Sequence, residues 1–257
     1  LAAAPAPVVA GDGEACMTED AFPKRLRRSP EDSRFLEICS MLDRSDEGAP
    51  KEELEQTVAL IRSYLGGIFA EPAVQFVLHD HTAPGKTPKE VVEDILDALA
   101  PHGTWKDLRD SAFRHVLCGD FHKSKDGVWT MEGGANSGLH TRLRYEALLD
   151  EGAICQTKDM GRPFGGEVAE VSYRIKPKGE KKLAGAIDVD DSVADHVAVL
   201  LEFNRTVCAL SEGGQCRRAL VKKEISGEEY PYTVWCKTYS DGKPRIYTAY
   251  PRACPGE

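Results

Sequence analysis

Apolar residues recur every three or four positions in two stretches between residues 31 and 110. Such spacing is typical of helices that bury one face and expose the other. Thr87-Pro88, directly before the second stretch, is a signal for the start of a helix. The pattern therefore predicts a small helical lobe over residues 31–110. Its two apolar stripes are Leu54, Val58, Ile61 and Leu65, and Val91, Val92, Ile95, Leu96 and Leu99.

After residue 111 the pattern changes to short runs of apolar and β-branched residues, which are typical of strands. Two helical stretches interrupt these runs. The first opens with Ser137-Gly138-Leu139-His140 and continues to about Asp150, and the second extends from about Asp191 to Phe203. A helical lobe followed by strands with two interspersed helices predicts an α+β fold. The predicted strands cover residues 115–118, 168–175, 205–210, 232–239 and 244–250.

These patterns divide the chain into three predicted segments. Residues 1–30 are rich in alanine, proline and charged residues and have no apolar period, so we expect a flexible arm there, attached at Cys16. Residues 31–110 form the helical lobe, and residues 111–257 form the mixed lobe. The longest aliphatic run, Val197 to Leu201, is much shorter than the roughly 18 apolar residues of a membrane span, so no membrane partner is expected.

The chain has eight cysteines and none of them forms a CxxC pair, which argues against a zinc ribbon or a thioredoxin-type motif. Leu1 and the small residues that follow it are typical of a processed N-terminus, such as removal of a signal peptide leaves. Together these features predict a secreted or periplasmic protein with disulfides. Cys208 and Cys216, which a short loop separates, are the predicted pair. The alternative is a cytosolic protein with eight reduced thiols.

The formal net charge is −9, which on its own argues against a nucleic-acid partner. The acidity lies in the first part of the chain: residues 1–110 carry 12 Lys and Arg against 21 Asp and Glu, whereas residues 111–257 carry 21 of each. Clusters of cations in the second part are most often solvent-exposed faces, but they can also bind a phosphate backbone. The charge pattern therefore leaves RNA as a candidate ligand. The clusters are Arg142 and Arg144; Lys176, Lys178, Lys181 and Lys182; Arg217, Arg218, Lys222 and Lys223; and Lys237, Lys243 and Arg245.

Two histidines in the second part have the chemistry for cleavage of RNA without a metal ion. That reaction needs a base for the ribose 2′-hydroxyl, an acid for the departing 5′-oxygen and a cation beside the phosphate. Histidine suits both proton roles because its ordinary pKa lies near neutrality. His115 lies in a predicted strand, and His140 lies in the first turn of a predicted helix, where free N–H groups can hold a phosphate. A histidine taken alone is nevertheless more typical of a core or a surface than of a catalytic site.

Three motifs occur in order along residues 111–257. They are HVLCGD at residues 115–120, SGLH at residues 137–140 and TAYP at residues 248–251. As a set, these motifs resemble those of the EndoU family of endoribonucleases. The resemblance implies an RNase A-like lobe of antiparallel β-sheets with flanking helices after the helical lobe. It also implies cleavage of single-stranded RNA, at or near uridylates, to give 2′,3′-cyclic phosphate ends with no metal in the chemical step.

The resemblance also implies site residues, position by position. By the family mechanism, His140 is the base for the 2′-hydroxyl and His115 is the acid for the leaving oxygen. Lys181 fits the lysine of the family best, with Lys182 and Lys178 as alternatives. The implied substrate-binding positions are Gly138, whose backbone N–H helps to hold the phosphate, Tyr250, whose ring stacks near the base or sugar, and Thr248, Gly185 and Lys182.

The chain departs from the family pattern at three places. Gly185 stands where the family has a serine that contributes to uracil recognition, which leaves the base preference open. Arg114 stands where animal members have a glutamate, which leaves open whether manganese stimulates the protein. The loop between the two histidines is longer than in animal and viral relatives, and we expect its Trp129 and Met131 to shape or cover the substrate groove.

Two other functions fit the same sequence. One is an RNA-binding protein with this fold and no turnover, which Gly185 and the long loop favour. The other is a secreted effector or toxin that acts with a protein partner, such as an inhibitor or an immunity protein, through the acidic helical lobe. Metal sites at residues 79–81 or 188–191 have too few ligands or the wrong spacing for a cation.

Overall fold

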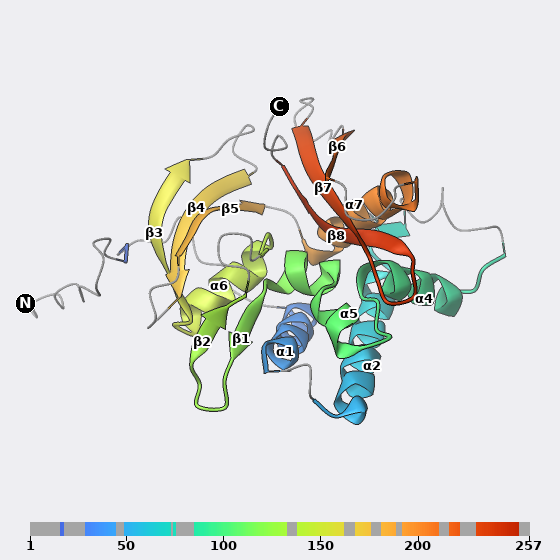
Figure 1. Ribbon diagram of the computed structural model, residues 1–257, viewed down its shortest axis with the longest axis horizontal. Helices are drawn as coiled ribbons and strands as arrows, with labels where there is room; N and C mark the ends of the chain where they lie inside the picture. Colours follow the sequence, from blue (N-terminus) through green and yellow to red (C-terminus); the bar gives the residue numbers. More distant parts are fainter. Residues whose placement is uncertain are drawn as a thin grey trace, which may run out of the picture.

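The computed structural model shows an α+β protein, with two three-stranded sheets in the upper half of Figure 1 and most helices below and to the right of them. It describes residues 16–17, 29–44, 49–72, 74–75, 85–132, 138–161, 168–175, 181–188, 192–210, 216–221 and 230–251. At residues 160–161, 168–169, 181–186, 188, 216–221 and 230–231 the description is limited to the backbone.

The helical lobe that the apolar stripes predict is present. It contains α1 (Pro30–Arg44), α2 (Lys51–Ile68), α4 (Pro88–Leu99) and α5 (Trp105–Arg109). Both predicted stripes are buried, one on α2 and one on α4. Thr87 caps α4: its hydroxyl accepts a hydrogen bond from the Glu90 N–H at 3.3 Å, and the Glu90 carboxylate accepts one from the Thr87 N–H at 2.7 Å. The predicted start of this helix is therefore confirmed.

The segment that carries His115 is helical rather than extended. Residues Phe113–Cys118 form a π-helix, η1, so the strand predicted there is wrong. Phe113, Val116 and Leu117 are all buried at helical spacing, and a short apolar run of this kind is compatible with either element. Single π-helical turns are frequent at functional sites.

A short hairpin follows η1. Its strands, β1 (Phe121–Lys123) and β2 (Trp129–Met131), pair in antiparallel register. The side chains of Trp129 and Met131 are buried together with Phe121 in a hydrophobic core. This part of the long loop therefore packs into the protein instead of covering a groove.

Helix α6 (Arg142–Asp150) begins after His140, so the predicted start near residue 137 is wrong. Gly138 and Leu139 have positive φ angles of 60° and 69°, which a right-handed helix does not accommodate. His140 consequently lies in the loop before the helix.

Helix α7 (Val193–Thr206) confirms the second predicted helix. The strand predicted over residues 205–210 is wrong. The Thr206 hydroxyl still donates to the backbone oxygen of Glu202 one turn earlier, at 2.7 Å, and residues Cys208–Leu210 form a 3₁₀ turn, η4. The β-branched residues Thr206 and Val207 led to the prediction of a strand. They lie at the end of α7 instead, because the buried face of this helix continues to pack on the core.

Two three-stranded antiparallel sheets complete the described fold. One has the order β3 (Ile154–Gly161), β4 (Val168–Ile175) and β5 (Lys181–Asp188), and the other β6 (Cys216–Val221), β7 (Tyr230–Thr238) and β8 (Pro244–Tyr250). The predicted strands at 168–175 and 244–250 coincide with β4 and β8, and the one at 232–239 overlaps β7. Strands β3, β5 and β6 are absent from the sequence prediction, because their Lys, Asp, Gly and Ala residues are depleted in strands generally.

Two hydrophobic cores hold the described elements together. The larger core combines α1, α2 and α4 with η1, α7 and strands β7 and β8. The smaller core lies between the β1–β2 hairpin, α6 and the β3-β4-β5 sheet. The helical lobe thus shares its core with the C-terminal sheet. The predicted division of the chain near residue 110, into a helical lobe and a mixed lobe, stays a prediction.

Described residues form the disulfides Cys16–Cys155, Cys39–Cys118 and Cys208–Cys236. The predicted pair of Cys208 and Cys216 is therefore wrong. Cys208 and Cys236 both lie in the larger core, where the end of α7 meets the middle strand β7. Cys216 instead begins the edge strand β6. Burial on a shared core decides the pairing, whereas the length of the intervening loop does not.

The N-terminal segment is attached at Cys16, as expected. Besides the disulfide to Cys155, the Met17 N–H donates to the backbone oxygen of Gln156 at 2.8 Å. Residues 1–15 and 18–28 of the predicted arm lie outside the described residues. In the part of the chain that the structure describes, no helix is both long enough and apolar enough to cross a membrane.

Candidate active site

The π-helix η1 and the loop before α6 lie side by side. The Leu139 N–H donates to the backbone oxygen of His115, and the His140 N–H donates to that of Val116, both at 2.9 Å. These contacts bring together the two histidines that the sequence motifs nominate. Both are largely buried, with exposed fractions of 4% for His115 and 7% for His140.

Gly138 permits this close approach. Its φ is +60°, and a Cβ atom at this residue would lie 1.9 Å from the backbone oxygen of His115 and 3.0 Å from its Cγ. Any side chain at position 138 would therefore collide with the segment that carries His115. The geometry of the loop explains why this position is a glycine. Its role in holding a phosphate stays a prediction.

Strand β8 provides an aromatic partner for each histidine. The ring of Tyr247 stacks on that of His115, with centroids 4.2 Å apart and planes inclined by 29°. The ring of Tyr250 stacks on that of His140, with centroids 5.7 Å apart and planes inclined by 10°. One strand thus lies beside both imidazoles. Tyr250 is the tyrosine that the motif nominates, and its role toward a base or sugar stays a prediction. Tyr247 is a residue that the sequence analysis missed.

A β-bulge explains how both tyrosines reach the same site. Side chains alternate along a regular strand, so residues three positions apart such as Tyr247 and Tyr250 ordinarily point to opposite faces. In this ladder Trp235 pairs with Thr248 and the next residue of β7 pairs with Ile246, so that Tyr247 has no partner across the ladder. Bulges re-aim side chains and are over-represented next to active sites. No local sequence signal marks this bulge, which is why Tyr247 was not foreseeable.

Thr248, which the motif nominates as a substrate-binding residue, lies between these two tyrosines on β8. Its side chain is buried, and its hydroxyl has no hydrogen-bond partner among the described residues. A buried hydroxyl without a partner is uncommon in proteins. Its role toward a substrate stays a prediction.

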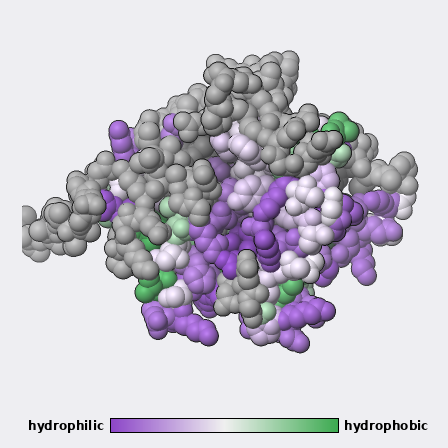
Figure 2. Space-filling model, in the orientation of Figure 1, coloured by the Kyte–Doolittle hydropathy of each residue, from purple (hydrophilic) through white to green (hydrophobic). Residues whose placement is uncertain are grey.

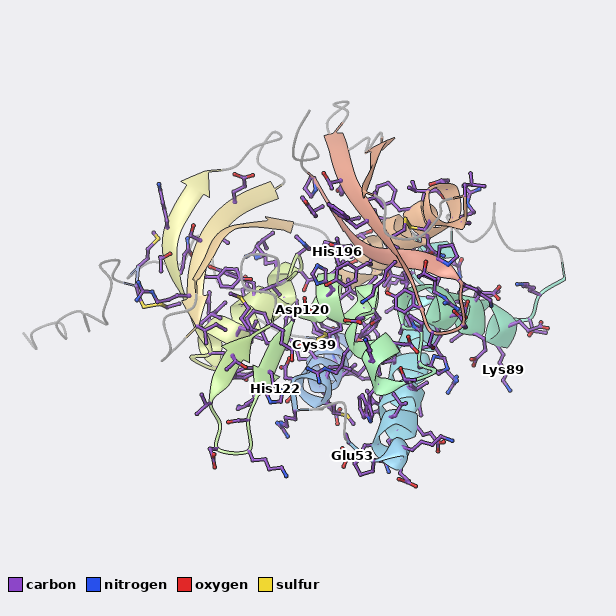
Figure 3. All side chains as sticks on the ribbon, in the orientation of Figure 1. Cys39, Glu53, Lys89, Asp120, His122 and His196 are labelled. Carbon is purple, nitrogen blue, oxygen red and sulfur yellow. A yellow bond between two sulfur atoms is a disulfide. The ribbon has the colours of Figure 1, made fainter. Side chains whose placement is uncertain are left out.

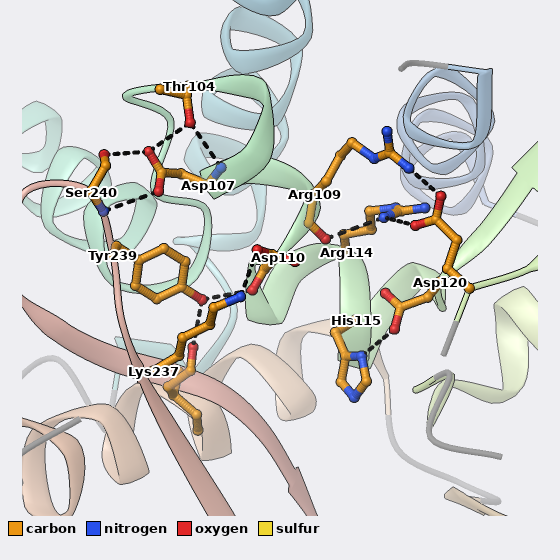
Figure 4. Close-up of polar contacts among 12 residues, drawn as sticks. Thr104, Asp107, Arg109, Asp110, Arg114, His115, Asp120, Lys237, Tyr239 and Ser240 are labelled. Atoms are coloured by element: carbon orange, nitrogen blue, oxygen red, sulfur yellow. Dashed lines mark hydrogen bonds and ion pairs between the residues drawn. The ribbon is translucent and has the colours of Figure 1, made fainter. Parts of the chain in front are cut away.

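Asp120 holds the ring of His115. The Nδ1 atom of His115 lies 2.5 Å from Oδ2 of Asp120, as the dashed line in Figure 4 shows. A carboxylate at this distance fixes the tautomer, because Nδ1 donates its hydrogen to the carboxylate and Nε2 remains for proton exchange. Asp120 lies near the middle of the molecule in Figure 3, between the two sheets. It is the last residue of the HVLCGD motif, and this contact joins it to the first residue of the motif.

Arg114 is directed toward the hairpin and not toward a metal site. Its guanidinium donates to the Glu132 carboxylate at 2.9 Å and to the backbone oxygen of Phe121 at 3.0 Å. Arg109 pairs with the same carboxylate (Figure 4). The residue that replaces the family glutamate therefore fastens the β1–β2 hairpin to η1.

Lys237 lies on the neighbouring strand β7, near the ring of Tyr247. Its ammonium is 5.6 Å from the centroid of the Tyr247 ring and 2.5 Å from Oδ2 of Asp110. The Tyr239 hydroxyl donates to the backbone oxygen of Asp110 at 2.8 Å (Figure 4). Burial raises the pKa of Tyr247 well above its usual range, and the carboxylates of Asp120 and Asp110 raise it further, so the phenol is neutral.

The lysine that the resemblance implies is described only through its backbone. Lys181 is the first residue of β5 and pairs with Arg174 of β4, whereas Lys182 pairs with Tyr173. Gly185 pairs with Val171 on the same strands. The side chains of Lys181 and Lys182, and the whole of Lys178, lie outside the described residues, so their roles stay predictions.

A small cavity adjoins His140. His196 of α7, for which the sequence suggests no partner, also lines it and is labelled near the middle of Figure 3. Figure 2 shows hydrophilic residues gathered in the middle of the face that it presents. The other residues that line the cavity are Val116, Val199, Leu200, Tyr232, Ala249 and Pro251.

The remaining polar candidates do not join this site. His102 lies after α4, where its Nδ1 is 3.0 Å from the backbone oxygen of Ala100. Within the described residues, no three His, Cys, Asp or Glu side chains are grouped as a metal site requires. The weak metal candidates at residues 79–81 and 190–191 lie outside the described residues, as does the side chain of Asp188.

The fold matches that of a solved endoribonuclease. XendoU, described as a splicing-independent endoribonuclease that processes snoRNA, superposes with a TM-score of 0.56 and 18% sequence identity, over 85% of this chain and 76% of XendoU. The endoribonuclease Nsp15 of Middle East respiratory syndrome coronavirus gives a TM-score of 0.38 and 22% identity, over 55% of this chain and 33% of Nsp15. No family model and no curated protein sequence matches the chain. The likeness to XendoU shows that the chain has an EndoU-like α+β fold, as the motifs predict.

Proposed function

We propose that this protein, whose fold is EndoU-like, is an endoribonuclease that cleaves single-stranded RNA. The observation that carries the proposal is the pair of histidines on adjacent backbones, His115 and His140, each stacked on a tyrosine of β8. Asp120 holds one of them in a single tautomer. Two histidines with different surroundings are what a reaction with one base and one acid requires. Endoribonuclease is also the activity named for XendoU.

The reaction that we assign to the site is a transesterification. His140 takes the proton of the ribose 2′-hydroxyl, and the 2′-oxygen attacks the adjacent phosphorus. The bond between phosphorus and the 5′-oxygen breaks, and His115 gives the proton on its Nε2 to that oxygen. The products are a 2′,3′-cyclic phosphate and a free 5′-hydroxyl. Proton exchange with water then restores both histidines.

Lys181 is the cation that we assign to the phosphate. Lys181 begins β5, where its backbone pairs with Arg174 of β4. Lys182 and Lys178 remain the alternatives. We assign the Gly138 N–H to the phosphate as well.

We propose that cleavage occurs at or near uridylates, with Tyr250 stacked near the base or sugar and Thr248 beside it. Gly185 has no hydroxyl to offer to uracil. A glycine at this position cannot distinguish uracil from other bases by a side-chain hydrogen bond. We therefore expect a weaker preference for uridylate than a serine at this position would give.

The chemical step is proposed to need no metal ion, because two histidines supply both proton transfers. Manganese stimulation is expected to be small. A carboxylate is the ligand that manganese prefers, and the position before His115 is occupied by the guanidinium of Arg114. The three disulfides support a secreted or periplasmic location, since disulfides persist in oxidising compartments.

The proposal is tested by cleavage of end-labelled oligo-U, oligo-C and oligo-A RNA, with a DNA oligomer as substrate control, in EDTA and in manganese. The variants are His140→Ala and His115→Ala, and the matched control is His102→Ala, which removes a histidine outside the site. We expect RNA-only cleavage in EDTA, with cyclic-phosphate ends. Loss of either site histidine is expected to slow it by about 10² to 10⁴-fold, and His102→Ala is expected to leave it unchanged.

Equal cleavage by parent and His140→Ala would overturn the assignment. Activity that disappears in EDTA and returns with one specific cation would overturn the metal-independent step. Tight RNA binding without product would identify an RNA-binding protein that has the fold and no turnover. Absence of both binding and cleavage would favour an effector that acts with a protein partner, such as an inhibitor or immunity protein.

A further inference from the structure

We propose that Tyr247 is a positioning residue for His115, which keeps the imidazole in the orientation needed to protonate the leaving oxygen. This inference rests on the proposed function. It concerns a residue outside the three sequence motifs, and it explains why β8 has a bulge at this position.

The first step of the argument is that one hydrogen bond does not fix an imidazole. Asp120 holds the ring of His115 at a single atom, Nδ1, at a distance of 2.5 Å. The ring is otherwise attached only through Cβ, so coupled rotations about the Cα–Cβ and Cβ–Cγ bonds can keep the Nδ1 contact and still carry Nε2 through an arc. The stacked ring of Tyr247, with its centroid 4.2 Å from that of His115, blocks the rotation on one side. The two contacts together define the plane of the ring as well as its tautomer.

The second step is that Tyr247 is itself held in place. The bulge directs it toward η1 although the regular alternation of β8 would direct it elsewhere. The ammonium of Lys237 lies 5.6 Å from the centroid of its ring, within the range of a cation–π contact. Lys237 is in turn held by Asp110 at the end of α5, at 2.5 Å. A chain of contacts therefore runs from α5 through β7 and β8 to His115.

The third step concerns charge. Lys237 is paired with Asp110, whereas Arg114 and Arg109 share the carboxylate of Glu132. Among the described side chains, those in contact with the ring of His115 include the carboxylate of Asp120 and the neutral ring of Tyr247. The carboxylate holds one atom of the ring, and the aromatic face holds its plane. An acid that must deliver its proton to one particular oxygen benefits from both contacts.

The test changes the leaving group of the substrate. This change distinguishes a loss of the acid step from a general loss of activity. An alkoxide such as the 5′-oxygen of a nucleoside needs a proton as it leaves, whereas 4-nitrophenolate leaves readily without one. Wild-type protein, Tyr247→Leu and Tyr247→Phe are compared on uridylyl-(3′,5′)-adenosine and on uridine 3′-(4-nitrophenyl phosphate). The Phe variant keeps the aromatic face and removes only the hydroxyl. Circular dichroism and urea unfolding establish that each variant is folded.

For Tyr247→Leu we expect kcat on the dinucleotide to fall by about 10- to 100-fold, because misplacement of a reacting group has effects of this size, while KM changes little. Release of 4-nitrophenolate is expected to stay near the wild-type rate, and Tyr247→Phe is expected to restore most of the dinucleotide activity. His115→Ala should show the same contrast between substrates in stronger form. His140→Ala should be slow on both.

An equal loss on both substrates, or no loss on the dinucleotide, would overturn the role of Tyr247. If Tyr247→Leu does not fold, Lys237→Met provides a second route, because it removes the contact on the ring of Tyr247 and should give a smaller loss with the same contrast. Equal loss on both substrates in Lys237→Met would overturn the proposal too. If wild-type protein cleaves neither substrate, the proposed function itself fails, and this outcome differs from all those above.

Discussion

Cys39 and Asp43 lie one helical turn apart on α1, and each contacts one of the two segments that carry the candidate histidines. Cys39 forms a disulfide with Cys118 of η1, three residues after His115. Asp43 pairs with Arg144 of α6, the helix that follows His140. One turn of one helix thus fastens both halves of the site. Helix α1 of the helical lobe therefore holds η1 and α6, and the proposed chemistry depends on the position of both segments.

Removal of the Cys39–Cys118 disulfide should lower both stability and activity. The double variant Cys39→Ala/Cys118→Ala is expected to lose about 2–4 kcal/mol of unfolding free energy and to have a lower kcat, since η1 is then free to shift on α1. Urea unfolding and RNA cleavage measure the two effects. The matched control is Cys16→Ala/Cys155→Ala, whose disulfide joins the N-terminal segment to β3. If both double variants lose kcat to the same degree, the bracing role of α1 is refuted.

Replacement of Asp43 by alanine should be strongly destabilising. The exposed fraction of both Asp43 and Arg144 is at most 1%, so the variant leaves a buried guanidinium with only the more distant carboxylate of Glu151, at 3.7 Å. Breaking a buried ion pair from one side costs about 3–5 kcal/mol. Chemical denaturation measures the change. The exposed ion pair between Lys51 and Glu55 on α2 is the control, and Glu55→Ala should have an effect below about 1 kcal/mol. A loss for Asp43→Ala as small as that of the control would contradict the prediction.

Gly138→Ala should damage the site more than the fold. The added Cβ would lie 1.9 Å from the backbone oxygen of His115, and the residue has a positive φ, so the loop must move away from η1. Alanine at a positive φ destabilises by more than about 1 kcal/mol, and displacement of His115 relative to His140 should lower kcat as well. Gly127→Ala is the control, because Gly127 also has a positive φ but its Cβ would meet no atom within 4 Å. Equal activity in the two variants would show that the close approach at residue 138 is unimportant.

Asp107 should make folding sensitive to acid. Burial alone raises the pKa of Asp107, but hydrogen bonds from Ser240 and Thr104 outweigh it and hold this pKa below its usual range. A lowered pKa in the folded state means that the unfolded state binds the proton more readily. The stability that this carboxylate contributes is therefore present above the ordinary pKa of aspartate, about 4, and is lost as the pH falls below it.

The comparison that tests Asp107 is urea unfolding from pH 6 down to acid, in wild type and Asp107→Asn. The loss of stability on acidification should be smaller in the variant, because asparagine does not titrate. Parallel curves for the two proteins would show that the contacts of Asp107 with the β7–β8 turn do not contribute to acid sensitivity.

The sequence predicted what depends on periodicity and on ordered motifs. The stripes on α2 and α4 and the ranges of β4 and β8 followed from local spacing, because each of these elements buries one face in a regular way. The histidines and Tyr250 were nominated by the order of three motifs, because no periodicity distinguishes them from ordinary core residues, and their roles stay predictions.

The rest depends on contacts between distant segments. The run around His115 is buried on every side, so its apolar pattern does not separate a π-helix from a strand. Tyr247 reaches His115 only because of a bulge that arises between β7 and β8. Cys208 forms its disulfide with Cys236 because β7 packs beside η4. The length of the loop between Cys208 and Cys216 does not reveal this packing.

The place of β8 in the chain has a consequence for synthesis. A ribosome makes the helical lobe, both histidines and five of the six strands of the two large sheets before it reaches residue 244. Until then neither imidazole has the aromatic ring on which it stacks, and the larger core lacks a strand. A nascent chain that has not yet emerged through β8 therefore carries both histidines without the surroundings that make them a site. If the proposed activity is correct, cleavage becomes possible only after nearly all of these 257 residues have been made.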